Sequence, residues 1–520
     1  MHRRPTRRRM RSLAVLIVGA LLFAALAQLG GSPLTATARQ EATPPEQVTI
    51  AFGSELTTMD PPFFTSSNEE TVYYAIFDTL VTRDAAGQII PGLAESWQTL
   101  DDNTWEFKLR AGVKFHDGTD LTSEDVKFTI DRIIDGTMEN PNISKLLTIK
   151  EVVAVDPLTV RIITSAPDAL MLARMAGIVS WIVPKHYIEA HGATHFATSP
   201  IGTGPYKFVS WEKDKELVLE ANPDYFLGAP AVKRIVFRPV PEPSTRLALL
   251  KSGDVDLIQN VPPDQADVIS GEEGLELATT PSLRSMYLIL RSDAAPTDDV
   301  RVRQAINYAI DKESLVNDIL GGYGLVSQGQ TMGKEYFGFN PDLAPYPYDP
   351  DKARALLAEA GYADGLTVKM LTPSGRYQED RTIAEAVAGQ LSEVGIQVEL
   401  EAVEFGVYVT RKLERTIEPI TLGAWSQPVF DADGVVFLLY RTDETWGVHY
   451  SNPRVDELAA QARTTIDQEA RRAMYAEALQ IIRDEAPVAF LHQLVDIYGR
   501  RVGAPIMPQP DETIVVQPKW

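Results

Sequence analysis

Cysteine is absent from all 520 residues of the chain. Its absence excludes disulfide bonds, thiolate metal ligands, cysteine nucleophiles and a lipid-modified cysteine. The sequence also lacks the Gly-x-Ser-x-Gly turn of serine hydrolases, the His-Glu-x-x-His pair of zinc proteases and the phosphate-binding Walker loop. Acidic side chains are plentiful, but no pair of them stands out for acid–base catalysis. We therefore expect a protein that is not an enzyme and that carries no cofactor.

Positive charge is scarce beyond the first 40 residues. Those residues hold seven of the 49 Lys and Arg residues and no acid, so the rest of the chain has 42 basic against 71 acidic residues. Such a body repels nucleic acids and anionic membranes, so we expect no nucleic-acid partner. The hydrophobic content of 44% is ordinary for a globular protein with ample core.

The N-terminal segment predicts a signal peptide at residues 1–38. Six Arg residues lie within the first 11 positions, Leu13–Leu29 is almost wholly apolar, and Ala36-Thr37-Ala38 offers a cleavage site. The alternative is a retained membrane anchor, because this apolar run is just long enough to span a bilayer. Residues 39–47 form a spacer with Pro and Thr. We expect export to the periplasm or to the outer face of the cytoplasmic membrane.

The most informative stretch is Ile201–Pro230. Gly202, Gly204 and Pro205 predict a rigid turn, after which apolar residues recur with a period of two. That period predicts two paired antiparallel strands. Their expected core-facing side chains are Tyr206, Phe208, Trp211, Leu217 and Leu219.

This stretch resembles the family 5 extracellular solute-binding proteins, the peptide- and nickel-type receptors of ABC importers. The shared pattern is Gly-Thr-Gly-Pro-Tyr, a Trp, Leu-x-x-Asn-Pro-x-Tyr and a Gly. Further blocks that resemble the family lie at Leu93–Trp97, Val113–Gly118, Gly253–Leu257, Asp298–Asp311 and Tyr450–Asp456. The resemblance therefore covers nearly all of residues 48–490.

A strand–helix–strand unit is predicted in the second half of the chain. Leu366–Met370 and Ile396–Leu400 alternate as strands, and an apolar stripe from Ile383 to Val394 predicts the helix between them. A run of this length favours a right-handed parallel crossover. The other elements expected nearby are a loop at Thr372–Tyr377, a strand at Ile420–Trp425 and a long helical region at residues 450–482.

The resemblance implies a two-lobed periplasmic binding protein of type II and of α/β class, with an extra subdomain inserted in the first lobe. We place the first lobe at residues 45–284 plus 490–520, the inserted subdomain at about 80–195, and the second lobe at residues 285–489. Ligand would lie in the cleft between the lobes, and closure around it would be the signal that the permease reads. The expected partners are an ABC permease and a small peptide or peptide-like ligand, and the receptor is expected to be a monomer.

One departure from the family bears on the ligand. In peptide receptors of this type, an acidic residue typically follows a Trp within a few positions and pairs with the amino group of the peptide. Here Trp425 is followed by Ser426–Pro428, and acids come only at Asp431 and Asp433. A modified peptide, an opine, a sugar or a metal chelate such as nickel therefore stays an alternative, and an exported hydrolase is a further one.

Histidine gives little support for a metal site. His186, His191 and His195 form the only cluster of histidines, but no Glu or Cys completes a set of ligands. His116 stands alone in a predicted strand–turn, where a structural role is the commoner one. We therefore expect no metal ligands.

The candidate ligand-binding residues follow the ends of predicted strands, because ligands lie beyond the carboxyl ends of the strands in open α/β sheets. An Arg fork there suits a carboxylate or phosphate, aromatic rings offer flat walls, and a carboxylate can pair with a ligand cation. The set from the second lobe comprises Arg376, Tyr377, Trp425, Asp431 and Asp433, and the first lobe adds Phe64 and Thr65.

The predicted signal peptide generates a first test. N-terminal sequencing of the protein expressed in a bacterial host should begin near Arg39, because cleavage follows the A-x-A site. Recovery of the full-length chain in the cytoplasm would contradict the prediction of export.

Overall fold

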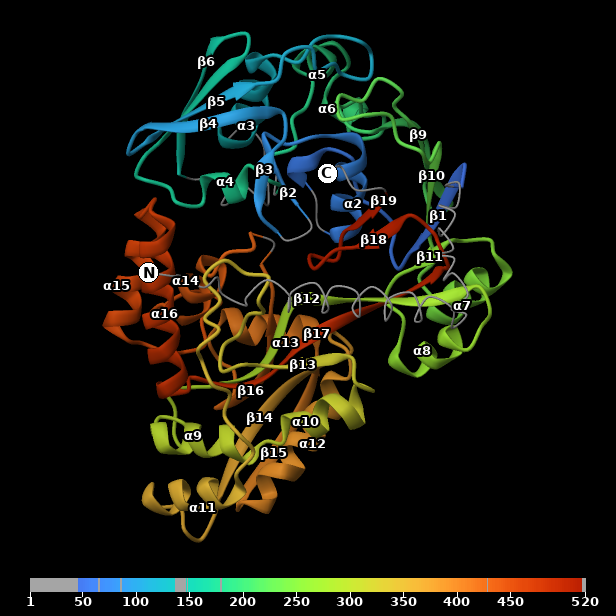
Figure 1. Cartoon of the computed structure of the whole chain (residues 1–520). Helices are drawn as coiled ribbons and strands as arrows, with labels where there is room; N and C mark the ends of the chain where they lie inside the picture. Colours follow the sequence, from blue (N-terminus) through green and yellow to red (C-terminus); the bar gives the residue numbers. More distant parts are fainter. Residues whose placement is uncertain are drawn as a thin grey trace, which may run out of the picture. The chain divides into compact units, whose positions relative to one another are not determined.

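Two long strands, β12 (Leu275–Leu290) and β17 (Val488–Arg501), pair antiparallel in the middle of the main sheet (Figure 1). The structure is a computed structural model, and it describes residues 45–63, 66–84, 87–135, 146, 148–177, 180–427 and 429–516. The pairing of β12 with β17 shifts register between Pro281 and Ser285, and again between Met286 and Tyr287.

The main sheet has eleven strands in the order β15-β14-β16-β12-β17-β11-β1-β10-β9-β8, and β13 pairs with β17 off this path. The strands from the N-terminal part of the chain are β1 (Gln47–Phe52), β8 (Tyr206–Glu212), β9 (Glu216–Ala221), β10 (Arg234–Pro239) and β11 (Leu257–Ile258). The others are β13 (Gly324–Val326), β14 (Leu366–Ser374), β15 (Ile396–Glu404) and β16 (Ile420–Trp425). β12 and β17 thus join strands that come from distant parts of the sequence.

The predicted hairpin after Gly204 is confirmed as β8 and β9, which pair antiparallel from Tyr206–Ala221 to Glu212–Glu216. The turn before it packs on the end of helix α2 (Ser67–Ile76). A Cβ atom at Gly202 would lie 2.1 Å from the carbonyl oxygen of Ile76, and one at Gly204 would lie 2.5 Å from the Ile76 carbonyl carbon. Glycine is therefore required here by the close approach of two backbones.

His116 holds the same turn and has a structural role. Its Nε2 donates to the Gly204 carbonyl oxygen at 3.0 Å, and its Nδ1 accepts from the Gly202 amide at 3.1 Å. Burial lowers the pKa of His116 to about 4, so the ring is neutral at pH 7. A neutral ring with one donor and one acceptor matches these two contacts.

A separate four-stranded sheet has the order β4-β5-β7-β6. Its strands are β4 (Ala94–Asp101), β5 (Thr104–Leu109), β6 (Ile149–Asp156) and β7 (Thr159–Thr164), and helix α3 (Ser123–Ile134) packs against it. Buried apolar side chains such as Phe107, Val126 and Ile162 form its own core. The neighbouring elements are η1 (Pro61–Phe63), β2 (Val81–Arg83), β3 (Ile89–Pro91), α4 (Met171–Arg174), α5 (Lys185–His191) and α6 (Ala193–Phe196).

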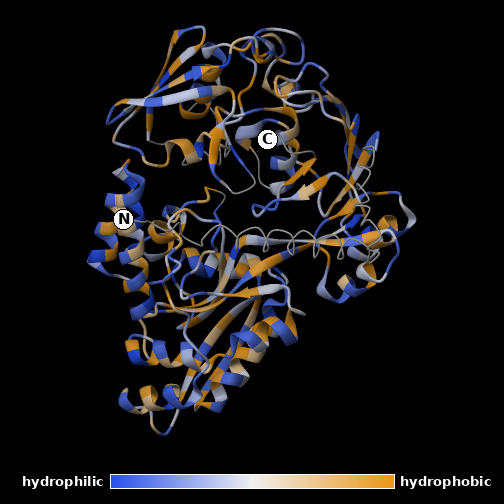
Figure 2. Ribbon diagram, viewed as in Figure 1, coloured by the Kyte–Doolittle hydropathy of each residue, from blue (hydrophilic) through white to orange (hydrophobic). Residues whose placement is uncertain are grey.

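The predicted strand–helix–strand unit is confirmed as β14, α12 (Asp380–Glu393) and β15, and its two strands pair in parallel. Strand β14 continues to Ser374, so the loop begins later than the predicted Thr372. β14 and β15 are rich in hydrophobic residues (Figure 2), and these contribute to two different cores. Alternate residues of β12 supply two cores, with Met286 and Leu288 in one and Tyr287 and Ile289 in the other.

Helices complete the two cores of this region. The region predicted as one long helical segment is two helices, α15 (Pro453–Thr464) and α16 (Gln468–Glu485), because the chain breaks after Thr464 and restarts at the N-cap Asp467. The others are α9 (Val300–Ala309), α10 (Lys312–Ser314), η3 (Leu315–Ile319), α11 (Pro350–Glu359), α13 (Phe405–Leu413) and α14 (Asp433–Tyr440). Elsewhere lie α7 (Pro243–Ser252), α8 (Pro263–Ser270), β18 (Ile506–Pro508) and β19 (Ile514–Val516).

Some predictions are not decided by this architecture. The predicted lobe boundaries at residues 284, 285, 489 and 490 stay predictions. The signal peptide, with its apolar run Leu13–Leu29, lies outside the described residues. None of the helices in the described part of the chain combines the length and the hydropathy needed to cross a membrane.

The backbone contact at Gly204 generates a test of stability. Gly204→Ala should lower the melting temperature, because the new methyl group would meet main-chain atoms that cannot rotate away. Overpacking of this kind costs about 1–3 kcal/mol. Gly389→Ala is the matched control, because Gly389 lies in α12 with nothing within 4 Å of an added Cβ. Since Ala favours a helix by about 1 kcal/mol over Gly, thermal unfolding should show this control unchanged or more stable. Equal melting temperatures for Gly204→Ala and the native protein would contradict the prediction.

Candidate functional site

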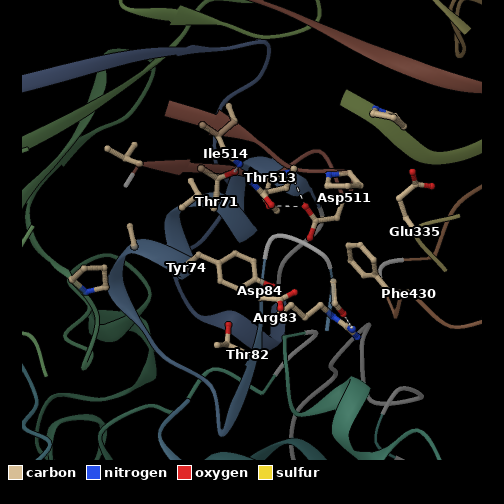
Figure 3. Close-up of a pocket in the computed structure, with 18 of the residues that line it drawn as sticks. Thr71, Tyr74, Thr82, Arg83, Asp84, Glu335, Phe430, Asp511, Thr513 and Ile514 are labelled. Atoms are coloured by element: carbon tan, nitrogen blue, oxygen red, sulfur yellow. Dashed lines mark hydrogen bonds between the residues drawn. The ribbon is translucent and has the colours of Figure 1, made fainter. Parts of the chain in front are cut away.

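A cavity of about 460 Å³ lies between parts of the chain that are far apart in sequence (Figure 3). Helix α2, the hairpin of β2 and β3, strand β10 and residues 509–516 supply most of its lining. Lys334, Glu335 and Phe430 come from the predicted second lobe. Ligand pockets typically span about 300–1,000 Å³, so this cavity has the size for a small organic solute.

Aromatic rings form much of the wall. Tyr74, Tyr206, Phe237 and Phe430 line the cavity, and Figure 3 shows Tyr74 and Phe430 on different segments around it. Phe237 is fixed from behind by stacking on Phe52, with ring centroids 4.9 Å apart. Walls of this kind offer rigid apolar area to a ligand at little conformational cost.

Arg83 joins the two sides of the cavity. Its Nη1 donates to the Gly87 carbonyl oxygen at 3.0 Å, and its Nη2 donates to the Val429 carbonyl oxygen at 2.8 Å. Its guanidinium carbon also lies 4.8 Å from the centroid of the Phe430 ring, in cation–π geometry. Burial lowers the pKa of Arg83 from its usual value. This side chain therefore acts as a bridge between β2 and the loop that carries Phe430.

Two carboxylates face the cavity without an ion-pair partner in the described residues. Asp511 accepts from the Thr513 amide at 3.1 Å and from the Thr513 hydroxyl at 2.6 Å, and burial raises its pKa. Glu335 accepts from Gln493 Nε2 at 2.9 Å. Within that part of the chain, no Lys or Arg nitrogen lies within 4.0 Å of either carboxylate. Among the described residues, neither group therefore has an ion-pair partner, although the charge of Arg83 opposes the rise in the pKa of Asp511.

The turn that carries Asp511 is tied directly to β12. The Leu283 amide donates to the Pro510 carbonyl oxygen at 2.9 Å, and Arg284 Nη2 donates to Glu512 at 3.2 Å. From β17, Gln493 Nε2 donates to the Ser282 carbonyl oxygen at 2.7 Å. These contacts surround the register shift after Pro281, so the cavity adjoins the point where β12 changes its pairing.

The predicted site residues Asp431 and Asp433 are both paired within the protein. Asp431 is buried and lies 2.9 Å from Arg471 Nη2, and Tyr475 donates to it at 3.2 Å. Asp433 is also buried, 2.8 Å from Arg463 Nε, and burial raises its pKa to about 6. The structure gives both carboxylates a cationic partner, and neither lines the cavity.

The other predicted residues from the second lobe lie together in part. The exposed Arg376 stacks over the rings of Tyr377 and Phe405, at 5.3 Å from each centroid. Trp425 is half-buried, and its Nε1 donates to the Gly434 carbonyl oxygen at 2.6 Å. None of Arg376, Tyr377 and Trp425 lines the cavity, so their role in binding stays a prediction. Phe64 and Thr65 lie outside the described residues.

Sequence reasoning did not select Tyr74, Arg83, Glu335, Phe430 or Asp511. One usable signal was present, because Gln509–Thr513 has the composition of a turn between apolar runs. In the predicted histidine cluster, the rings of His191 and His195 pack against each other and against Tyr187. In the described ranges no group of three or more His, Cys, Asp or Glu residues could hold a metal ion.

A family assignment follows from comparison with known proteins. The model of the bacterial extracellular solute-binding proteins, family 5, middle region, matches residues 88–447. The chain therefore belongs to the family 5 extracellular solute-binding proteins, whose members are substrate-binding components of ABC importers outside the cytoplasm. The predicted family and the receptor role are confirmed at this level.

The relatives cover nearly the whole chain. The glutathione-binding protein GsiB of Pectobacterium atrosepticum is 31% identical over 476 residues, 88% of this chain and 91% of that protein. The solved structure of AgaA from A. tumefaciens with agropinic acid is 28% identical with a TM-score of 0.70, over 90% of this chain and 96% of that one. HbpA2 from Haemophilus parasuis has a TM-score of 0.83 at 24% identity, over 91% of this chain and 100% of that one. These matches confirm the two-lobed α/β fold of a type II periplasmic binding protein.

The buried pair of Asp431 and Arg471 generates a test of its structural role. Arg471→Met should lower the free energy of unfolding by about 3–5 kcal/mol, because it leaves a buried carboxylate without its partner. Arg472→Met is the control, since the neighbouring Arg472 is half exposed and its ion pair with Glu469 is long, at 3.9 Å. Denaturant unfolding should show little change in the control. The pair is not structural if both variants unfold at the same denaturant concentration as the native protein.

Proposed function

We propose that this receptor captures a small peptide or peptide-like solute in the cavity of Figure 3. The observation that carries the proposal is the origin of the lining, because Tyr74 and Asp511 come from the predicted first lobe and Glu335 and Phe430 from the second. A solute that contacts both sides favours the closed arrangement over any open one. The GsiB relatives, which are named for glutathione binding, support a peptide-like solute.

Contacts between the two predicted lobes, at two separate places, support closure of the receptor around its solute. Arg83 bonds to Val429 beside the cavity, and at another edge the Ala169 amide donates to the Arg463 carbonyl oxygen at 3.0 Å. Ile466 packs there against the core of the four-stranded sheet. We propose that these contacts form on closure and that the permease recognises the closed receptor.

We expect the remaining features of this receptor to match those of the family. The receptor binds its solute without chemical conversion, acts as a monomer, uses no cofactor and has no nucleic-acid partner. It is exported after removal of residues 1–38, and works with its permease at the outer face of the cytoplasmic membrane. The acidic charge of the chain beyond residue 40 supports the exclusion of nucleic acid.

A second candidate solute is an opine. AgaA, whose structure contains agropinic acid, is 28% identical to this chain. A sugar and a metal chelate stay alternatives, and NikZ from Campylobacter jejuni, solved with Ni(L-His), is 25% identical. The class of solute is decided by binding measurements on one preparation of the mature protein.

Native mass spectrometry tests the proposal. The mature protein is mixed in turn with glutathione, a pool of di- and tripeptides, and agropinic acid. We expect one peptide-like molecule per chain, released with its mass unchanged. Hydrolysis of the pool would show an enzyme, and selective retention of agropinic acid would favour the opine. Saturable binding of neither peptides nor glutathione would overturn the peptide proposal.

A pair of variants then places the site. Phe430→Leu keeps an apolar side chain but removes the ring, so it should weaken the retained solute roughly threefold to tenfold. Arg376→Ala should leave affinity unchanged, because Arg376 does not line the cavity. The strand-end prediction gives the opposite result, since losing a charge partner there weakens an anionic ligand at least roughly tenfold. Isothermal titration calorimetry separates the two, and melting temperatures confirm that both variants fold.

A further inference from the structure

We infer that the cavity recognises a positively charged group of its solute, such as a protonated amine, through the carboxylates of Asp511 and Glu335. This inference rests on the proposed function for the identity of the site and adds the chemistry that the site selects. The family pattern would place amine recognition in the loop after β16. We place it instead at the turn between β18 and β19. The reasons are the charge of the lining, an unsatisfied hydroxyl and the connection to β12.

Among the described residues, the lining holds three carboxylates (Asp84, Glu335 and Asp511) and two cations (Arg83 and Lys334), so negative charge is in excess. In the described part of the chain, the side chain of Asp511 accepts only from Thr513, and Glu335 accepts from the neutral amide of Gln493. Burial raises the pKa of Asp511, and the charge of Arg83 opposes that rise, but the donors of Arg83 are directed to the carbonyl oxygens of Gly87 and Val429. Lys334 is exposed. A carboxylate removed from water is costly unless a cation or several donors compensate it, and a bound amine supplies both.

An independent observation comes from Tyr206. Its side chain lines the cavity and is only 1% exposed, yet among the described residues its hydroxyl has no hydrogen-bond partner. Buried hydroxyls of folded proteins are almost always paired. The Tyr206 hydroxyl, unpaired among the described residues, is therefore an unmet hydrogen-bonding group in the wall beside the cavity.

The walls suit a cation as well. Tyr74 and Phe430 present aromatic rings to the same cavity as the two carboxylates (Figure 3). An ammonium group over an aromatic face gains further electrostatic attraction when it is shielded from water. An anionic solute would meet the carboxylates of Asp511 and Glu335 instead, and like charges at close range are strongly unfavourable.

The two carboxylates are attached to different strands of the central pair. Asp511 follows Pro510, whose carbonyl oxygen accepts from Leu283 of β12, and Glu335 accepts from Gln493 of β17. A solute whose polar groups contact both carboxylates would link the turn after β18 to the segment after β13. Recognition of the charge and stabilisation of the closed form would then be one event.

The first experiment varies the peptide. Calorimetry compares a tripeptide pool carrying free amino groups with the same pool after N-acetylation, which removes the positive charge. The native protein should bind the free pool at least about tenfold more tightly than the acetylated one. Asp511→Asn should lose most of this preference, and Glu335→Gln part of it. Asn keeps an oxygen that can accept from Thr513, so the turn is preserved.

Asp318→Asn is the matched control, because it removes one negative charge from an exposed position outside the cavity. It should bind both pools like the native protein. Equal affinity of the native protein for the free and acetylated pools would overturn the inference. So would an unchanged preference in both Asp511→Asn and Glu335→Gln.

The second experiment does not depend on peptides. Phenethylammonium and 3-phenylpropionate have similar shapes and opposite charges at pH 7, and fragments of this size bind with dissociation constants of about 1 mM. The native protein should bind the ammonium and not the carboxylate, and Asp511→Asn should lose that binding. Ammonium binding without peptide binding would uphold the charged subsite and overturn the peptide proposal. Peptide binding with no preference for the ammonium over the carboxylate would overturn the charged subsite and uphold the peptide proposal.

Discussion

The pairing of β12 with β17 is the constraint on which the rest of the structure depends. These two strands hold one sheet together, with strands β11 to β8 on one flank and β16 to β15 on the other. Where the pairing shifts after Pro281, the freed backbone groups find other partners. Gln493 donates to the Ser282 carbonyl oxygen, Tyr336 donates to that of Leu283 at 3.0 Å, and the Leu283 amide donates to Pro510. Buried backbone groups must be paired, so this segment remains ordered although it leaves the ladder.

The position of the cavity depends on that segment of β12. The turn of residues 509–513 bonds to β12, and the half-buried Asp496 of β17 lies beside Glu512 and Arg284. Burial, followed by the charge of Glu512, raises the pKa of Asp496 to about 7. Polar groups at such a junction have few alternative arrangements, because each lost contact leaves a charge or a backbone group unpaired. A solute that contacts Asp511 therefore acts on the same network that shapes the strand crossing.

Two kinds of buried carboxylate are distinguished by their partners. Asp60 accepts two hydrogen bonds from Arg132, at 3.0 and 2.8 Å, and Asp431 accepts hydrogen bonds from Arg471 and Tyr475. These carboxylates are compensated within the fold, so they need no ligand. The half-buried Asp511 accepts, among the residues that the structure describes, only from the neutral Thr513 in the same turn. The difference in pairing, not the residue type, separates a structural carboxylate from a candidate for recognition.

Local pattern in the sequence determined much of this protein, and tertiary contact decided the rest. Sequence patterns predicted the hairpin of β8 and β9, the parallel unit of β14, α12 and β15, and the family. These predictions succeeded because periodicity, glycine spacing and turn residues act between close neighbours in the chain. The sequence could not show that Asp431 meets Arg471, since that pair joins a loop to a helix 40 positions away. Nor could it show the cavity, whose lining combines Tyr74, Phe430 and Asp511. Such positions converge only after the central strands have paired, because burial and charge compensation depend on distance in space.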